Sequence, residues 1–307
     1  MILIVSDLHL GKGPPAADGA MSDMAKANGA KANGAKTNGA KANGQKTNTP
    51  TTDPRSVNDD QSLVDLLECI RSIGPELKEV IFLGDTFDAF IEYKSSIPDS
   101  VTKWVRTVAE IQQRNIKVRF FAGNHDRWHG DYIRNALSID VRRKPQIVSA
   151  KDKNIWMEHG DSAAPNSGLV RFIRHISDQA WVLILYKLVL PFGLGQQLAA
   201  FVSRNFSNFD PDPMTIQGLK TYAFDLLTKE RVDLVVMGHC HNASLDKVEV
   251  SDGTKPLGSA QSDSSKNALY ANTGDWYESR TFLLISDSVQ LCRWTSKDLT
   301  VLQQEIF

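Results

Sequence analysis

Five short apolar runs in this chain are each followed at once by a cluster of acidic, amide or histidine residues. The clusters are SDLHLG at residues 6–11, LGDTFD at 83–88, AGNHD at 122–126, EHGD at 158–161 and MGHCH at 237–241. In open α/β sheets, binding sites form beyond the carboxyl ends of the strands. The pattern therefore predicts an α/β fold in which several strands end at one shared site.

β-rich runs alternate with helical patterns along most of the chain. We expect strands at 2–5, 80–83, 118–121, 155–158 and 232–237, helices at 63–73 and 101–114, and a helical and loop region at 166–229. This alternation favours parallel pairing at the centre of the fold. Later runs at 245–250, 268–272, 281–285 and 289–294 lack helices between them and predict a meander or a second sheet. Two packed sheets with helices outside would accommodate every element.

A low-complexity repeat interrupts this pattern. Residues 25–48 repeat a five-residue unit of Lys, Ala, Asn and Gly, without one large apolar side chain. Such a tract buries too little surface to offset its chain entropy, so we expect residues 16–61 to be a disordered insertion. About 260 residues remain for folding, enough for one sizeable core. We therefore treat residues 1–307 as a single domain with this insertion and a helical insertion at 166–229.

Composition narrows the class of protein further. Lys and Arg total 35 against 36 Asp and Glu, and this net charge of -1 gives no support to a nucleic-acid binder. Three scattered cysteines are too few for a disulfide framework or a thiolate zinc site, so a reducing, cytoplasmic location is expected. The short apolar start lacks a basic region, unlike a signal peptide. No stretch reaches 18 uninterrupted apolar residues, the length of a membrane span.

Two pairs of potential metal ligands stand two residues apart. In an extended chain, Asp7 and His9 would point to one side, as would His239 and His241, while the residue between each pair would face away. Oxygen and imidazole ligands without thiolate suit manganese, iron or zinc and do not choose among them. Further ligands are available at Asp85, Asn124 and His159, and glycines that permit close backbone approach precede the clusters at Gly84, Gly123 and Gly238.

Any one of these residues alone has a simpler explanation. A single Asp after a strand is usually a helix cap or a turn former, and a single His is usually a surface or core residue. The clustering changes this balance, because five of the seven histidines fall inside the motifs, which a solvated surface gives no reason to expect. The set therefore favours a metal site.

The ordered motifs DLH, GD, GNHD, HGD and GHCH, from Asp7 to His241, resemble those of the calcineurin-like metallophosphoesterases. The resemblance implies a four-layer sandwich, in which two mixed β-sheets are flanked by helices, with a helical lid insertion. It also implies two divalent metal ions, manganese or else iron or zinc. In that family's arrangement, one ion is held by Asp7, His9 and His241, the other by Asn124, His159 and His239, and both are bridged by Asp85.

The same resemblance implies hydrolysis by a metal-bridging hydroxide. His125 would face the substrate and give a proton or a hydrogen bond to the leaving oxygen. Two roles remain open for Asp126, which would either orient His125 or cap the following turn.

Longer stretches are similar to one branch, the UDP-2,3-diacylglucosamine diphosphatases of lipid A synthesis. The similarity includes GDWYES at residues 274–279 and Trp128, which is followed by DY at 131–132. These enzymes release UMP and a 1-phosphorylated diacyl sugar. One branch of them carries Arg where this chain has His125. The chain therefore belongs with the His-bearing relatives, whose substrates are less uniformly established.

An apolar stretch offers a site for the acyl chains of such a lipid. Residues 181–194 read WVLILYKLVLPFGL, which is either a buried core helix or part of a lid. Its position between HGD and GHCH favours the lid, and exposed apolar groups on it would seat the enzyme peripherally on the cytoplasmic membrane. The expected substrate contacts are Asn124, His125, Trp128, Arg171, Arg174 and Lys187.

Two other functions compete with this one. A soluble phosphodiesterase or protein phosphatase of the same superfamily would share the ligand set but would not need an apolar lid. A metal-free scaffold for protein binding would be expected to have lost ligands, whereas this sequence retains the whole set. Neither a nucleic acid nor an obligate protein partner is expected.

Overall fold

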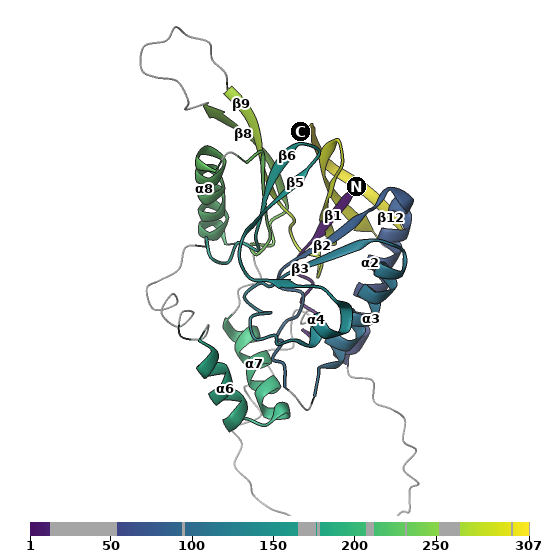
Figure 1. Ribbon diagram of the computed structural model, residues 1–307, viewed down its shortest axis with the longest axis vertical. Helices are drawn as coiled ribbons and strands as arrows, with labels where there is room; N and C mark the ends of the chain where they lie inside the picture. The colour runs from purple at the N-terminus through teal and green to yellow at the C-terminus, as the bar shows by residue number, and fades with distance from the viewer. Residues whose placement is uncertain are drawn as a thin grey trace, which may run out of the picture.

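The computed structural model describes residues 1–12, 54–93, 96–164, 176, 179–206, 212–230, 232–251, 265–295 and 297–306. In this part of the chain, two β-sheets pack face to face and helices cover their outer sides (Figure 1). The architecture is the expected four-layer sandwich.

The first sheet has seven strands in the order β12-β11-β10-β1-β2-β3-β4. Its parallel half contains β1 (Ile2–Val5), β2 (Glu79–Leu83), β3 (Lys117–Phe121) and β4 (Val141–Arg142). Its antiparallel half contains β10 (Thr281–Ile285), β11 (Ser288–Thr295) and β12 (Asp298–Ile306). The parallel strands direct their carboxyl ends, and the loops after them, to one edge of the sheet.

The second sheet has five strands in the order β5-β6-β7-β9-β8. These are β5 (Gln146–Ala150), β6 (Lys153–Met157), β7 (Leu234–Met237), β8 (Ser244–Ser251) and β9 (Ser265–Asn272). The strands β6, β7 and β9 are parallel, while β5 and β8 run antiparallel at the two edges.

Alternating side chains of the central strands supply separate cores. On β1, Leu3 and Val5 pack toward the helices α2 (Pro54–Ile73), α3 (Asp99–Gln113) and α4 (Tyr132–Leu137), and the short 3-10 helix Gly74–Glu76 follows α2. Ile4 points the other way, into the core between the two sheets. On the far side, α8 (Pro213–Lys229) covers the second sheet. These strands are apolar on both faces because both sides of each sheet are covered by other elements.

Two further helices lie beyond the edge of the sandwich, α6 (Ala180–Val189) and α7 (Phe192–Phe206) (Figure 1). Their outer side chains are apolar and exposed, and Leu188 reaches 80%. No single helix in the described ranges is long and apolar enough to span a membrane. Only α6 and α7 taken together meet that criterion, with a bend of 120° between them. The stretch at 181–194 is therefore not a buried core helix.

Several expectations need correction. Helix α2 already begins at Pro54, so residues 54–61 are helical rather than part of the predicted disordered segment 16–61; its other residues, 16–53, lie outside the described ranges. Proline is compatible with a first helical turn, and the apolar periodicity that marks the helix starts only later. The later strands were expected to form a meander or a second sheet, but they divide between the two sheets. β10 and β11 belong to the first sheet, and β8 and β9 belong to the second.

Candidate active site

The ligand candidates meet at the carboxyl ends of the strands, as expected. Asp7 follows β1, Asp85 follows β2, Asn124 follows β3, His159 follows β6 and His239 follows β7. The two sheets thus each contribute to one centre from loops that are far apart in the sequence.

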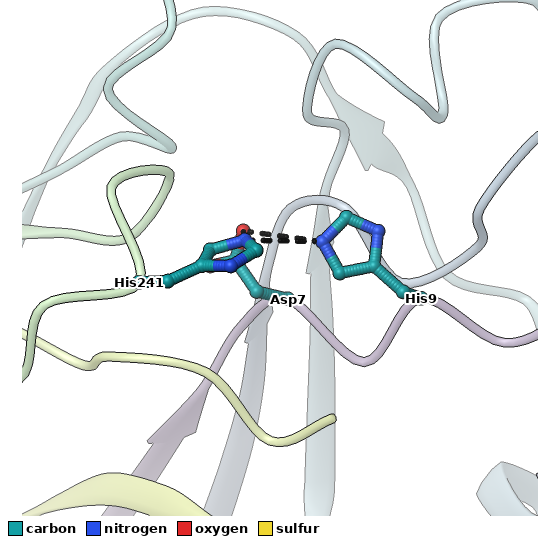
Figure 2. Close-up of side chains that lie close together, drawn as sticks. All are labelled: Asp7, His9 and His241. Carbon is teal, nitrogen blue, oxygen red and sulfur yellow. Dashed lines mark hydrogen bonds and ion pairs between the residues drawn. The ribbon is translucent and has the colours of Figure 1, made fainter. Parts of the chain in front are cut away.

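Asp7, His9 and His241 form the first group, and Figure 2 shows their side chains pointing toward one another. His241 Nε2 lies 3.2 Å from Asp7 Oδ1, and His9 Nε2 lies 3.8 Å from the same oxygen. The two Nε2 atoms are 3.2 Å apart. Such separations suit ligands of one ion, because metal–nitrogen bonds are about 2.0–2.1 Å long.

Asp85, His159 and His239 form the second group, with ligand atoms within 4.8 Å of one another. His159 Nε2 lies 3.0 Å from Asp85 Oδ2. On the other side of the ring, Nδ1 is 2.9 Å from the carbonyl oxygen of Leu83 and donates to it in the tautomer that leaves Nε2 as the ligand atom. This is how metal-binding histidines are normally oriented.

Left-handed backbone conformations place these side chains, which corrects the expectation of an extended chain. The φ angles are 54° at Asp7, 46° at His9, 49° at Asp85, 68° at His239 and 51° at His241. Non-glycine residues rarely adopt such angles, and strained residues of this kind cluster at functional sites. Backbone hydrogen bonds hold the first loop on the second, at 3.0 Å from the Asp7 amide to the carbonyl of residue 84.

Three glycines leave the space that the ligands occupy. A β-carbon at Gly123 would lie 2.1 Å from Asp85 Oδ1, and one at Gly84 would lie 2.4 Å from the His159 ring. At Gly238 it would lie 2.6 Å from Asp7 Oδ2. The prediction that these glycines allow close approach is confirmed.

The electrostatics of the centre favour a cation. Burial would raise the pKa of Asp7, but the positive charges of His159 and His241 outweigh it and lower this pKa to about 2. Burial would lower the pKa of His159, yet Asp85 and Asp7 raise it to about 10. For His239, burial and the nearby His159 lower the pKa to about 4. The ionised Asp7 and the neutral His239 are already in the protonation states in which these groups bind metal, whereas His159 would lose its proton when an ion binds.

Some buried polar atoms here need a partner that the described residues do not supply. The side-chain oxygen of Asn124 is buried and accepts no hydrogen bond from them. Asp7 Oδ1 and His159 Nε2 have charged neighbours but no hydrogen bond of acceptable geometry. Buried polar atoms are rarely left so, and an amide oxygen, a carboxylate oxygen and an imidazole nitrogen all suit a hard or borderline divalent ion. The residues therefore fit the two-ion centre.

His125 stands beside this centre. Its amide donates to Asp85 Oδ1 at 2.9 Å, and its Nε2 lies 3.9 Å from Asp85 Oδ2. Its Nδ1 is 2.6 Å from the carbonyl oxygen of Asp88. Its Nε2 is therefore the ring nitrogen that faces the Asp85 carboxylate.

Asp126 was expected either to orient His125 or to cap the following turn, and its carboxylate does neither. Its carboxylate accepts hydrogen bonds of 3.0 Å from the amides of Thr86 and Phe87, and burial together with Asp85 raises its pKa to about 7. It thus caps the turn that follows Asp85 and also accepts from the Gly123 amide of its own loop at 3.3 Å, so it binds these amides rather than the turn after it or the His125 ring. It is a positioning residue that ties the loop after β3 to the loop after β2.

The GDWYES segment also supports the ligands. The amides of Trp276 and Tyr277 donate to the carbonyls of Ser6 and Asp7, each at 3.1 Å. Trp276 is fully buried, and its indole N–H donates to the Ser62 carbonyl at 3.1 Å. The segment joins the C-terminal part of the chain to the first ligand loop.

A largely apolar cavity of about 410 Å³ opens beside the centre. Asn124, His125 and Trp128 line it, as expected of substrate contacts, whereas Lys187 does not; its Nζ lies 6.0 Å from the Tyr93 ring centre. Arg171 and Arg174 lie outside the described residues. The loops after β2 and β3 and the helices α6 and α7 supply the remaining lining, which sequence reasoning missed: Asp88, Ala89, Phe90, Ile91, Arg127, Tyr186, Leu198, Ala199, Val202 and Ser203. Apolar residues spaced three to four apart on α7 were the available signal.

Fold, ligand set and family comparison agree on the class of this protein. The calcineurin-like phosphoesterase family matches residues 1–243, and the chain belongs to that family. It is a hydrolase of phosphorus esters or anhydrides that uses divalent metal ions. A catalytically inactive, metal-free scaffold is thereby set aside.

Individual relatives carry a more specific name. A protein named UDP-2,3-diacylglucosamine hydrolase from Porphyromonas gingivalis is 36% identical over 109 residues, which are 36% of this chain and 40% of that relative. A Haemophilus influenzae protein of the same name is 21% identical over 188 residues, 60% of this chain and 77% of its own. A solved phosphoesterase from E. coli has 12% identity and a TM-score of 0.40, covering 99% of this chain and 98% of that one.

Proposed function

We propose that this protein hydrolyses the pyrophosphate of UDP-2,3-diacylglucosamine, or of a similar nucleotide-diphosphate lipid, to UMP and a 1-phosphorylated diacyl sugar. The observation that carries the proposal is the apolar cavity that starts at Asn124 and His125 and is walled by lid helices. The names of the relatives support the same substrate class.

The ligand residues divide between two ions in this proposal. Asp7, His9 and His241 would hold one ion, Asn124, His159 and His239 the other, and Asp85 would bridge them. Two divalent ions, manganese or else iron or zinc, would supply an activated water and neutralise charge on the phosphoryl oxygens. The chain contributes the spacing, because the strained loops and the three glycines fix where each ligand atom lies.

His125 would donate a proton to the leaving oxygen. Its Nδ1 is hydrogen-bonded to Asp88, so its Nε2 is the atom available toward the reacting phosphorus. Trp128 would contact the bound lipid from the cavity wall, where its ring lies 5.0 Å from the Tyr186 ring. Arg171 and Arg174 would serve as contacts for the phosphate or the headgroup.

The lid would also bring the enzyme to its substrate. Large apolar side chains are exposed on α6 and α7, including Ile184, Leu188 and Phe201. A helical surface of this kind binds the interface between lipid headgroups and acyl chains. We propose that the protein lies in the cytoplasm, peripherally on the membrane surface, and the exposed apolar side chains support the membrane contact.

The test is release of UMP from the diacyl substrate in mixed micelles by manganese-loaded protein, with a chelator control. Val202→Gln, in the cavity wall and 47% exposed, should lower kcat/KM for this substrate by about tenfold or more, because it places an amide against an acyl chain. Phe224→Gln, on α8 away from the cavity and 50% exposed, is the matched control and should change little.

Hydrolysis of bis(p-nitrophenyl) phosphate gives the second arm. Both variants should retain it at near the wild-type rate. A protein that cleaves this soluble diester well but releases no UMP from the lipid would contradict the proposed substrate and favour a soluble phosphodiesterase.

A further inference from the structure

A serine on the lid helix reaches the proton donor. Ser203 lies on α7 and is 7% exposed. Its hydroxyl donates to Asp88 Oδ1 at 2.8 Å, and its oxygen lies 3.3 Å from His125 Nδ1. These partners are separated from it by 115 and 78 residues in the sequence. The contact is therefore made only when α7 is seated on the loops of the site.

Asp88 links the serine to the histidine through two different groups. Its carbonyl oxygen lies 2.6 Å from His125 Nδ1, while its carboxylate accepts from Ser203. The Nδ1–H can thus be shared between the Asp88 carbonyl and the Ser203 oxygen. Such a shared bond fixes both the tautomer of the ring and its rotation about χ2.

A second contact on the same face of α7 seats the helix. Gln196 Nε2 donates to the carbonyl of Ile91 at 2.6 Å. Gln196 and Ser203 are seven residues apart, which places them on one side of the helix two turns from each other. The face that carries Ser203 is therefore the face that docks on the loop after β2.

We propose that Ser203 is a positioning residue through which the lid orients His125 for proton donation. The inference rests on the role proposed above for His125. When both ring nitrogens carry a proton, the held Nδ1–H directs the Nε2–H to the leaving oxygen. The Nε2 proton moves to that oxygen as the P–O bond breaks, which leaves the neutral Nδ1–H ring, and the ring then regains a proton from water. Without the Ser203 hydroxyl, the ring is less restrained and this transfer slows.

Leaving groups distinguish this role from a purely structural one. An alkoxide leaves poorly and needs the proton, whereas p-nitrophenolate leaves without it. For two uridine 5′-phosphodiesters, a methyl and a p-nitrophenyl ester, Ser203→Ala should lower kcat about tenfold or more for the methyl ester, with KM nearly unchanged. The p-nitrophenyl ester should be affected less than about twofold, and Ser203→Thr, which keeps the hydroxyl, should restore the methyl ester rate.

The matched control is Gln197→Ala, an exposed position on the same helix. It should leave both rates unchanged, and the unfolding temperature of each variant shows whether it is folded. Equal losses for the two esters in Ser203→Ala would overturn the proposal.

A measurement without turnover tests the same point in metal-free protein. Nitrogen-15 NMR of labelled histidine rings, with His125→Gln for assignment, should show a hydrogen-bonded Nδ1–H of His125 in the wild type and in Ser203→Thr. In Ser203→Ala the Nδ1 resonance should shift, because the Asp88 carbonyl is the acceptor that remains of the two. An unchanged Nδ1 resonance in Ser203→Ala would also overturn the proposal. Neither test uses the lipid, so failure of the proposed substrate is recognised separately, by the absence of UMP.

Discussion

The ligand residues sit on unusually costly backbone. Asp7, His9, Asp85, His239 and His241 all have positive φ angles, each of which costs on the order of 1–3 kcal/mol for a non-glycine residue. The loops tolerate this cost because each is hydrogen-bonded to its neighbour and because Leu8, between two ligands, is fully buried in the core. The contacts within the protein thus set the shape of the site.

Asp85 and His125 should differ in what their loss removes. Asp85→Ala deletes the carboxylate that faces His159 and should abolish activity together with most of the bound metal. His125→Ala should lower the rate about 10²–10⁴-fold, the usual contribution of a proton donor, while metal content stays near the wild-type level. Elemental analysis and steady-state rates check both; an active Asp85→Ala protein would show that the assignment is wrong.

A single methyl group should disrupt the centre at Gly123. In Gly123→Ala the new β-carbon would lie within 2.1 Å of Asp85 Oδ1, so the loop must shift, and metal content and activity should both fall sharply. Gly193→Ala is the control, because nothing lies within 4 Å of a β-carbon there. Comparable metal content in the two variants would contradict this reading of the glycine.

Which side chains come together was predictable from the sequence, but their geometry was not. The spacing of aspartate and histidine identified the candidate ligands, while the left-handed angles that aim them depend on the hydrogen bonds between loops. Asp126 was expected either to orient His125 or to cap the following turn, yet it binds the amides of a loop forty residues away. Ser203 carries no local signal, since a serine in mid-helix looks the same whether or not it reaches a distant histidine.

At the scale of elements, helix α2 closes the insertion that carries the repeat. Both carboxylate oxygens of Asp59 accept from the Gly11 amide at 2.9 Å. This contact joins the end of the first ligand loop to the first turns of α2. Asp59 lies in the segment that was expected to be disordered. That expectation included residues 54–61 because they lack the apolar periodicity of an amphipathic helix.

Asp59 should make stability depend on pH in a measurable way. Burial raises its pKa to about 6, partly offset by the Gly11 hydrogen bond, whereas an unfolded aspartate titrates near about 4. Between these values the folded state binds more protons than the unfolded state, so this group's contribution falls as pH rises from about 4 to about 6. Asp59→Asn should remove this group's part of the pH dependence, which denaturant unfolding of both proteins at several pH values would detect.

An opposite result would be informative as well. If the difference in unfolding free energy between wild type and Asp59→Asn were constant from pH 4 to pH 6, Asp59 would have an ordinary pKa and would be solvated in the native state. Experiments above pH 7 supply the baseline, since the carboxyl is ionised there in both states.

The central elements were predicted well and the peripheral ones poorly. Buried strands such as β1 and β7 are continuous apolar runs, which the sequence displays directly. The edge strand β12 was missed, because most of its side chains are exposed and its register depends on pairing with β11. The apolar stretch of α6 was located by composition, and only the structure shows that its apolar side chains are exposed rather than buried.

At the scale of the whole molecule, the two sheets act as a rigid support for one set of loops. Ile4, Ile81 and Leu83 of the first sheet face Ile155 and other apolar side chains of the second across a shared core. This core fixes the distance between the loops of the two sheets, and hence between the two ligand groups. The sequence shows which strands bear ligands, whereas the pairing of the sheets follows from tertiary packing.

The insertion should be dispensable for folding and chemistry. Replacing residues 16–50 with a short Gly-Ser linker leaves every described ligand and the Gly11–Asp59 contact in place, and loop length itself contributes to stability only slowly. Unfolding temperature, metal content and turnover of a soluble ester should stay near wild-type values. A large loss of bound metal would show that the insertion belongs to the site.

The contact between Gly11 and Asp59 also has a practical use. It joins the two ends of the sequence between Gly11 and Asp59, and Gly11 is only two residues beyond His9. A fluorescent domain grafted between those ends would be carried next to the metal centre without being built into the framework. Energy transfer between this domain and a labelled lipid could then report binding, so the repeat would be a suitable insertion point for a biosensor.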